Sequence, residues 1–201
     1  SRSNKDGRMN PVEPVWKSYI VETTHSIFTP QQCQMVIAKG MSLKKEEAKV
    51  GMAKPEGGVD TKKRITSISW IPFKDMPEMY RDIEATMLKA NGNHFGFDGM
   101  RLTEVAQFTH YLTGGFYDWH MDNDVVGKHQ PPVRKISMTL LLSDPATFEG
   151  GELEFMSKGK TAKLKQGQAI FFASWLQHRV KPVTQGERKS LVMWFGGPPF
   201  K

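Results

Sequence analysis

Short apolar segments separated by glycine turns fill the second half of the chain, and this pattern restricts the fold more than any other feature. From Met100 onward, segments of strand length follow one another, with turn-forming pairs such as Gly150-Gly151 between them. Within Val133 to Leu142, large apolar residues alternate with Ser, Thr and Leu, as on a strand whose two faces differ. Many short strands with frequent turns predict a β-sandwich or a jelly roll.

The predicted strands extend from the middle of the chain to its end, and glycine-containing turns punctuate them. They are Ile65 to Ile71, Leu102 to Leu112, Val133 to Leu142, Glu152 to Met156, Thr161 to Lys165, Gln168 to Phe172, His178 to Val183 and Lys189 to Phe195.

Two helices are predicted in the first half of the chain. Thr29-Pro30 is typical of an N-cap followed by proline at the first helical position, and Gly40 is expected to stop this helix. A second helix is predicted from Pro77 to about Lys89, with Asn91-Gly92 as its end. Its expected core-facing stripe is Tyr80, Ile83, Met87 and Leu88.

Composition is that of an ordinary globular protein, with 201 residues and 38% hydrophobic residues. We therefore expect one domain, 1–201, in which 1–99 supplies supporting helices and outer strands and 100–201 supplies the β core. The longest apolar runs have strand length, so no membrane-spanning segment is predicted. Cys33 is the only cysteine, which excludes an internal disulfide and favours a reducing cytoplasm.

The formal net charge of +7 raises the question of a nucleic-acid partner. The basic residues are mixed with acidic ones, and no helix-turn-helix, zinc-finger or aromatic RNA-binding motif is recognisable, so this partner class is the weaker expectation. The charged, glycine-containing segment from Lys44 to Lys63 is expected to be either a lid or a disordered connection. Val125 to Val133 is a second candidate lid.

His120 and Asp122 are two residues apart, so on a strand or at its end their side chains point to the same face. His178 begins a later predicted strand. Two imidazoles and one carboxylate can hold one face of an octahedral Fe(II) and leave the opposite face open. Because Cys33 is distant, a structural zinc site with thiolate ligands is not expected. His-x-Asp alone is a weak signal, and it gains specificity when Arg188-x-Ser190 follows.

Arg188 offers a bidentate fork for a carboxylate, and on a strand next to that of His178 it would point into the same cavity. A surface arginine, or an ion pair with Glu187 or a nearby aspartate, is the alternative interpretation. Gly114-Gly115 permits a tight hairpin turn or a bulge. The two strands of such a hairpin would bring Tyr111 toward the same site, where its hydroxyl could donate to a carboxylate. An ordinary core tyrosine is the alternative for this residue.

Together these residues lie in three stretches that resemble the Fe(II)- and 2-oxoglutarate-dependent dioxygenases, in particular the prolyl 4-hydroxylase-like branch with the PKHD-type hydroxylases. The stretches are YLTGGFYDWHMDND, SMTLLLSDPATFEGGELEF and HRVKPVTQGERKSLVMW. The resemblance covers about Gln107 to Trp194. It implies a mainly β protein with flanking helices, namely a double-stranded β-helix, which is a cupin-like jelly roll.

The resemblance also implies roles and cofactors. His120, Asp122 and His178 would ligate Fe(II), and Arg188 would bind the distal carboxylate of 2-oxoglutarate. Ser190, Tyr111, Thr139 and Leu141 would complete the cosubstrate pocket, although some relatives have a tyrosine where Leu141 stands. O2 is the expected oxidant and ascorbate an accessory reductant.

The implied reaction is hydroxylation of a prolyl residue in a peptide or protein, with release of succinate and CO2. A free amino acid or a nucleic-acid base is the alternative substrate, and a non-enzymatic metal-binding β-barrel is the alternative to an enzyme. Base-repairing relatives usually carry a second arginine shortly after the cosubstrate arginine, where this chain has Lys189.

Overall fold

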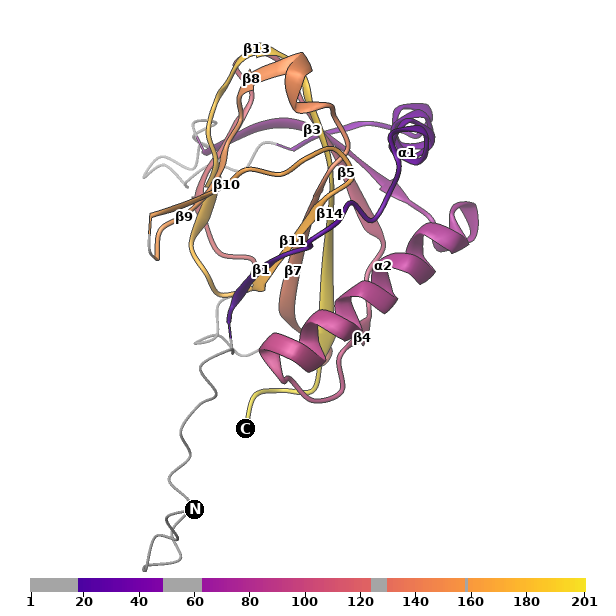
Figure 1. The fold of residues 1–201 in the computed structure, drawn as a ribbon, viewed down its shortest axis with the longest axis vertical. Helices are drawn as coiled ribbons and strands as arrows, with labels where there is room; N and C mark the ends of the chain where they lie inside the picture. The colour runs from indigo at the N-terminus through magenta and orange to yellow at the C-terminus, as the bar shows by residue number, and fades with distance from the viewer. Residues whose placement is uncertain (1–17, 49–62, 124–129, 158) are drawn as a thin grey trace, which may run out of the picture.

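The computed structural model describes residues 18–48, 63–123, 130–157 and 159–201. Most of the first expected lid, Lys44 to Lys63, lies outside this part of the chain, as do residues 125–129 of the second. The described elements form a curled, largely antiparallel sheet with two helices against one side (Figure 1). This confirms the mainly β fold with flanking helices, in a jelly-roll arrangement.

One half of the curled sheet is a broad main layer, and the other half is a smaller layer that faces it. The main layer has the order β1 (Ile20–Glu22), β11 (Ala169–Ala173), β7 (Val133–Leu141), β14 (Arg188–Gly197), β5 (Ala106–Tyr111) and β3 (Arg64–Ile71). The smaller layer continues with β6 (Phe116–His120), β12 (His178–Val180), β9 (Leu153–Phe155) and β10 (Lys160–Ala162).

Four further strands lie at the margins. β2 (Glu46–Ala48) pairs with β3, and β4 (Arg101–Leu102) pairs with β14. β13 (Val183–Gly186) and β8 (Phe148–Gly150) form a separate two-stranded sheet. The predicted strand Leu102 to Leu112 is therefore two strands, β4 and β5. Short 3-10 turns cover Phe73–Asp75 and Pro145–Thr147.

The alternation predicted for Val133 to Leu142 is confirmed. Met138 and Leu140 are fully buried in the core between the main layer and the helices. Ser137 and Thr139 point to the opposite face, into the space between the two layers, because successive strand residues alternate sides. β14 follows the same rule, with Leu191, Met193 and Phe195 on the helix side. The inner face of the curled sheet thus carries these polar side chains beside a second apolar cluster, which includes Leu141, Leu153 and Phe155.

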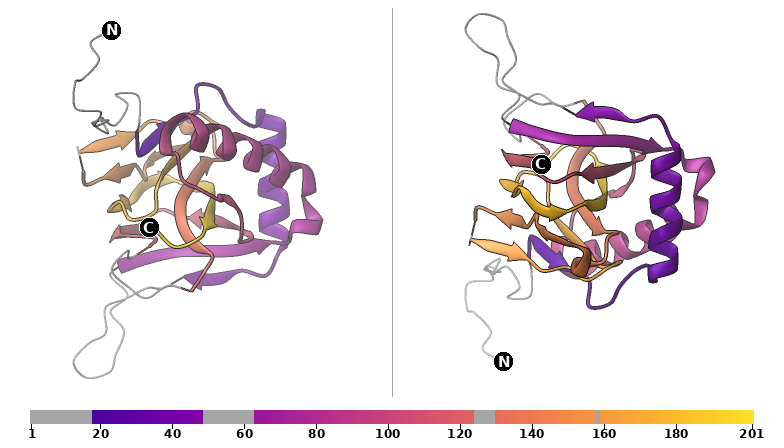
Figure 2. Two further views of the ribbon diagram at one scale, coloured as in Figure 1. Left: turned by 90° about the horizontal axis from the view of Figure 1, so that it is seen from below. Right: turned by 90° about the horizontal axis from the view of Figure 1, so that it is seen from above.

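Both helices cover the outer face of the main layer (Figure 2). α1 (Pro30–Ser42) begins with a capping box, in which Thr29 Oγ1 accepts from the Gln32 N–H at 3.2 Å and Gln32 Oε1 accepts from the Thr29 N–H at 2.9 Å. No helix of the described residues is long and apolar enough to cross a membrane.

The predicted stop of α1 at Gly40 is wrong. Gly40 lies inside the helix and is buried where the helix meets the main layer. Its carbonyl accepts a hydrogen bond from Ser69 Oγ at 2.8 Å. A Cβ at this position would lie 2.3 Å from the ring of Phe108, so the glycine is required by close helix–sheet packing rather than by a turn.

α2 (Pro77–Ala90) confirms the second predicted helix, but two details differ. Leu88 is 47% exposed, so it does not belong to the buried stripe with Tyr80, Ile83 and Met87. The chain also continues through a π-helical turn, Asn91–Phe95, before Gly96 adopts a left-handed conformation with φ of 72°. The extra turn places Phe95 in the core.

The chain turns between Tyr111 and His120 as expected, but the two strands that flank the turn do not form a hairpin. Gly114 has φ of 89° and allows the tight reversal. However, β5 and β6 do not pair with each other, because β3 lies between them and pairs with both. β3 therefore contributes side chains to the inner face between these two strands.

Replacing Gly40 by alanine should lower the free energy of unfolding by about 1–3 kcal/mol, because the new methyl group must displace the Phe108 ring. Chemical denaturation monitored by tryptophan fluorescence measures this change. Gly92→Ala is the matched control, since nothing lies within 4 Å of a Cβ there. Equal stability of the two variants would contradict the packing explanation.

Candidate active site

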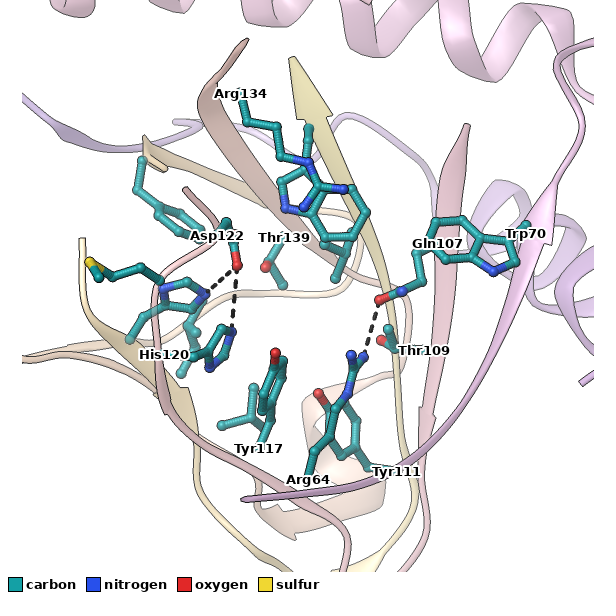
Figure 3. Close-up of a pocket in the computed structure, with 17 residues that line it drawn as sticks. Arg64, Trp70, Gln107, Thr109, Tyr111, Tyr117, His120, Asp122, Arg134 and Thr139 are labelled. Carbon is teal, nitrogen blue, oxygen red and sulfur yellow. Dashed lines mark hydrogen bonds and ion pairs between the residues drawn. The ribbon is translucent and has the colours of Figure 1, made fainter. Parts of the chain in front are cut away.

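Two antiparallel strands bring the candidate metal ligands together. In the ladder between β6 and β12, His120 stands directly opposite His178. Asp122 follows the end of β6, where its N–H and that of Asn123 both donate to the carbonyl of Ser174, at 2.9 and 3.0 Å. These two bonds hold the chain after β6 so that the carboxylate turns back toward the histidines (Figure 3).

Asp122 lies between the two imidazoles. Its Oδ1 is 3.5 Å from Nε2 of His120 and 3.4 Å from Nε2 of His178, and the three candidate ligand atoms lie within 4.8 Å of one another. Each Nδ1 is within hydrogen-bond distance of a backbone carbonyl, at 2.7 Å for His120 and 2.8 Å for His178. Both rings therefore present Nε2 to the centre, as metal-binding histidines commonly do.

A serine pair supports the carboxylate from behind. Ser137 Oγ on β7 donates to Asp122 Oδ2 at 2.6 Å, and it lies 3.0 Å from Ser174 Oγ. Oδ1 remains directed at the imidazoles. The donor set of two imidazoles and one carboxylate, with a hydrogen-bonded second carboxylate oxygen, fits Fe(II) with open coordination positions.

The electrostatics match a site prepared for a cation. Burial raises the pKa of Asp122, but the charge and hydrogen bond of His178 outweigh burial and hold this pKa well below its usual range. Burial lowers the pKa of His178, and Asp122 more than reverses this effect and raises it. Burial and the neighbouring His178 lower the pKa of His120 to about 3.

The three residues line a cavity of about 270 Å³ between the two layers of the sheet. Thr139 of β7 lies at its back, and Tyr111 and Thr109 of β5 lie on the wall that faces the histidines (Figure 3). Tyr117 stacks on His120, with ring centroids 3.4 Å apart and an interplanar angle of 11°. The stack fixes the orientation of this imidazole.

Arg188 begins β14 and is 4% exposed. Its Nη1 donates to Ser190 Oγ at 3.2 Å, and Ser190 Oγ in turn makes a short hydrogen bond with Thr109 Oγ1. Among the described residues, no carboxylate lies within ion-pair distance of this guanidinium, and burial lowers its pKa. Gly151 leaves room for it, since a Cβ there would lie 2.8 Å from Arg188 Cδ.

The ion pair between Arg188 and Glu187 that the sequence left open is not present. Glu187 instead lies 2.7 Å from His110 Nε2 and 3.5 Å from Lys189 Nζ. Strand alternation puts these neighbours on the face opposite Arg188. A buried guanidinium without a protein carboxylate is costly unless an anion joins it, which favours a ligand-binding interpretation of Arg188.

His178 and Arg188 do not lie on neighbouring strands, which was the condition for their sharing one cavity. β12 pairs with β6 and β9, whereas β14 pairs with β4, β5 and β7. Arg188 and Leu141 line an adjacent cavity of about 450 Å³, which shares Leu153 with the first. The guanidinium thus lies behind Tyr111, whose ring centroid is 5.6 Å away, rather than on the wall beside the histidines.

Sequence reasoning missed several side chains of the first cavity. They are Arg64 and Trp70 of β3, Gln107 of β5, Tyr117 of β6, Arg134 of β7 and Trp194 of β14. The insertion of β3 between β5 and β6 brings Arg64 into the cavity. In the sequence this residue follows directly after the charged segment Lys44 to Lys63. The alternation of Arg64, Thr66 and Ile68 is the sequence signal that places Arg64 on this strand, which begins one residue before the predicted Ile65.

Affinity for a divalent metal should fall with acidification, because the ion must displace the proton that Asp122 stabilises on His178. The proton competes with the metal at pH values below the raised pKa of His178. In that range the metal affinity should fall about tenfold for each pH unit if one proton is displaced. Calorimetric titration with Zn(II) from about pH 5 to about pH 8 measures the slope. A flat profile would contradict a site built from His178 and Asp122.

Ser137→Ala should weaken metal binding by about 10- to 100-fold, because the carboxylate of Asp122 loses the hydrogen bond that orients it. Competition with a fluorescent chelator gives the affinity. Ser143→Ala is the matched control, since that hydroxyl accepts from the Lys189 N–H and does not contact the ligands. Equal losses in the two variants would point to a general effect on folding.

Comparison with known proteins gives a family for this arrangement. Residues 106–196 match the model of the 2OG-Fe(II) oxygenase superfamily. A PKHD-type hydroxylase of Teredinibacter turnerae is 34% identical over 131 residues, which are 62% of this chain and 58% of that protein. One of Hyphomonas neptunium is 44% identical over 84 residues, which are 40% of this chain and 38% of that protein. The chain thus matches less than two thirds of the length of either relative.

Solved structures support the same fold. The viral collagen prolyl hydroxylase of Paramecium Bursaria Chlorella virus-1 superposes with a TM-score of 0.70 at 20% identity, over 90% of this chain and 97% of that one. A Pseudomonas putida prolyl-4-hydroxylase gives 0.67 at 20% identity, over 90% and 93%. The segment that matches the model of the 2OG-Fe(II) oxygenase superfamily thus contains His120, Asp122 and His178, and the whole described fold is similar to that of these solved prolyl hydroxylases.

Proposed function

We propose that this chain is an Fe(II)- and 2-oxoglutarate-dependent dioxygenase that hydroxylates an unactivated C–H bond. One observation carries the proposal: two imidazoles and a carboxylate converge within 4.8 Å, with both Nε2 atoms directed inward. When bound, iron and 2-oxoglutarate supply the oxidising chemistry, in which O2 is consumed and succinate, CO2 and a hydroxylated product leave.

The protein's own contribution is binding and orientation. His120, His178 and Asp122 would hold the ion on one side and leave the side toward the cavity open. The stack of Tyr117 on His120 and the hydrogen bond from Ser137 to Asp122 keep two of these ligands in place before the cofactors arrive. Pre-oriented ligands of this kind do not have to reorganise when the ion binds.

Arg188 would bind the distal carboxylate of 2-oxoglutarate, with help from the hydroxyls of Ser190 and Tyr111. Support comes from its burial, with no carboxylate at ion-pair distance among the residues that the structure describes, and from its hydrogen bond to Ser190. Thr139 and Leu141 project from the same strand face as Ser137. They would form the wall between the ion and the guanidinium, since Thr139 lines the first cavity and Leu141 the second.

A prolyl residue in a peptide or protein is the proposed target. The names of the similar proteins support this substrate class, since they are PKHD-type and prolyl hydroxylases. The cavity of about 270 Å³ accommodates a residue-sized group and opens to the surface, which suits one residue of a longer chain. A free amino acid is the alternative substrate. For a nucleic-acid base, Lys189 would have to replace the second arginine, but its ammonium lies near Glu187.

The direct test is anaerobic binding of Fe(II) and 2-oxoglutarate, followed by aerobic turnover against a library of proline-containing peptides with ascorbate as the reductant. We expect iron-dependent succinate and a hydroxylated peptide in equal amounts. Asp122→Ala should abolish both products, because the site loses its anionic ligand. Binding of iron without any succinate from 2-oxoglutarate would favour a non-enzymatic metal-binding barrel instead.

Arg188→Met should raise the concentration of 2-oxoglutarate needed for half-maximal binding by about 10- to 100-fold, since charge-assisted hydrogen bonds to the distal carboxylate are lost. Titration of the protein loaded with Zn(II), which has no redox chemistry, measures binding without turnover. Arg81→Met, at an exposed position on α2, is the control and should bind normally. Unchanged binding in Arg188→Met would remove Arg188 from the cosubstrate site.

A further inference from the structure

A second buried guanidinium faces the candidate metal ligands across the first cavity. Arg64 begins β3, pairs in register with Tyr117 of β6, and is 8% exposed. Its side chain rises between the rings of Tyr117 and Tyr111 toward the centre of the cavity (Figure 3). Because Arg188 is proposed to bind the cosubstrate, no function has yet been given to Arg64.

Arg64 has few protein partners. Its Nη2 donates to Gln107 Oε1 at 3.2 Å, and its guanidinium carbon lies 4.3 Å from the centroid of the Tyr117 ring. Its Nε is buried without a hydrogen-bond partner. Among the described residues, no carboxylate lies within ion-pair distance of this guanidinium. Arg134, which lines the same cavity, differs in this respect because Glu104 accepts from its Nε at 2.7 Å and from its Nη2 at 2.5 Å.

A guanidinium that is buried without a counter-charge destabilises the folded protein, because it loses its hydration and gains no ion pair in return. Asp122, the carboxylate of the cavity wall, is already shared between the two histidines and Ser137. The missing counter-charge of Arg64 is therefore best supplied by a ligand. A carboxylate matches the planar fork of a guanidinium.

The position of Arg64 distinguishes substrate from cosubstrate. Arg188 lies behind Tyr111 in the adjacent cavity, whereas Arg64 extends into the first cavity beside Tyr117, the ring that stacks on His120. Because the Tyr117 ring contacts both the guanidinium and the His120 imidazole, an anion on Arg64 would lie close to the candidate iron ligands. An anchor at this distance can place a neighbouring C–H group at the open face of the ion.

We propose that Arg64 and Gln107 bind a carboxylate of the substrate, so that the target residue carries or adjoins an acid. This inference rests on the proposed function. Because Gln107 uses Oε1 to accept from Arg64, its Nε2 amide can donate to the same carboxylate. Two sources have this chemistry: the α-carboxylate of a free or C-terminal residue, and the side chain of an acidic neighbour in a peptide.

Binding of matched acid and amide probes tests the inference. The protein is loaded with Zn(II) and 2-oxoglutarate, which permits binding without turnover. Calorimetry then compares N-acetyl-L-proline with N-acetyl-L-prolinamide for the first source. It compares the amidated dipeptides acetyl-Pro-Glu and acetyl-Pro-Gln for the second. The members of each pair differ in one charge and almost nothing in size.

We expect the acid of one pair to bind roughly 10- to 100-fold more tightly than its amide, the range of charge-assisted hydrogen bonds. Arg64→Met should remove this preference, and Arg64→Lys should restore part of it, because lysine keeps the charge but not the fork. Arg81→Met is the control for loss of a distant arginine and should keep the full preference. Binding of 2-oxoglutarate should be unchanged in all three variants.

Equal binding, or no binding, of acid and amide in both pairs would overturn the inference, as would a preference that survives Arg64→Met. Loss of 2-oxoglutarate binding in Arg64→Met would also overturn it, because Arg64 would then serve the cosubstrate. The proposed function fails separately, at the first stage, if the wild-type protein loaded with metal does not bind 2-oxoglutarate.

Discussion

The register between β6 and β12 is the constraint on which the site depends, because it sets His120 directly opposite His178. A slip of one residue would turn one imidazole to the other face of the sheet and remove it from the centre. The chain after β6 is tied to the Ser174 carbonyl, which returns the Asp122 carboxylate to both rings. The backbone hydrogen bonds of the fold thus bring the three candidate metal ligands together before any cofactor is present.

Two buried arginines without an ion-pair partner among the described residues are the second organising feature. Arg188 and Arg64 are both more than nine-tenths buried, and neither has a carboxylate at ion-pair distance among the described residues. They lie on different sides of Tyr111, one behind it and one beside it in the first cavity. Such an arrangement is stabilised by two anionic groups rather than one. A dicarboxylate cosubstrate and an acid-bearing substrate would together supply this charge.

Features that depend on local sequence were predictable. The alternation of β7 and the N-cap at Thr29 follow from strand and helix geometry, and both are present. Features that depend on distant partners were not. Gly40 looks like a helix stop because the sequence does not reveal that Phe108 packs against it. Arg64 fell between the expected loop, which ended at Lys63, and the expected strand, which began at Ile65. The pairing of β3 with both β5 and β6, which joins segments far apart in the chain, was not predictable.

The same distinction applies to the predicted position of Arg188. Its spacing from His178 suggested neighbouring strands, but the intervening β13 leads the chain from the smaller layer to the main one.

Anomalous X-ray scattering at the iron edge, from crystals grown anaerobically with Fe(II) and 2-oxoglutarate, tests the account most directly. We expect one iron ion, ligated by Nε2 of His120, Nε2 of His178 and Oδ1 of Asp122. Iron bound elsewhere, or beside only one of these histidines, would contradict it.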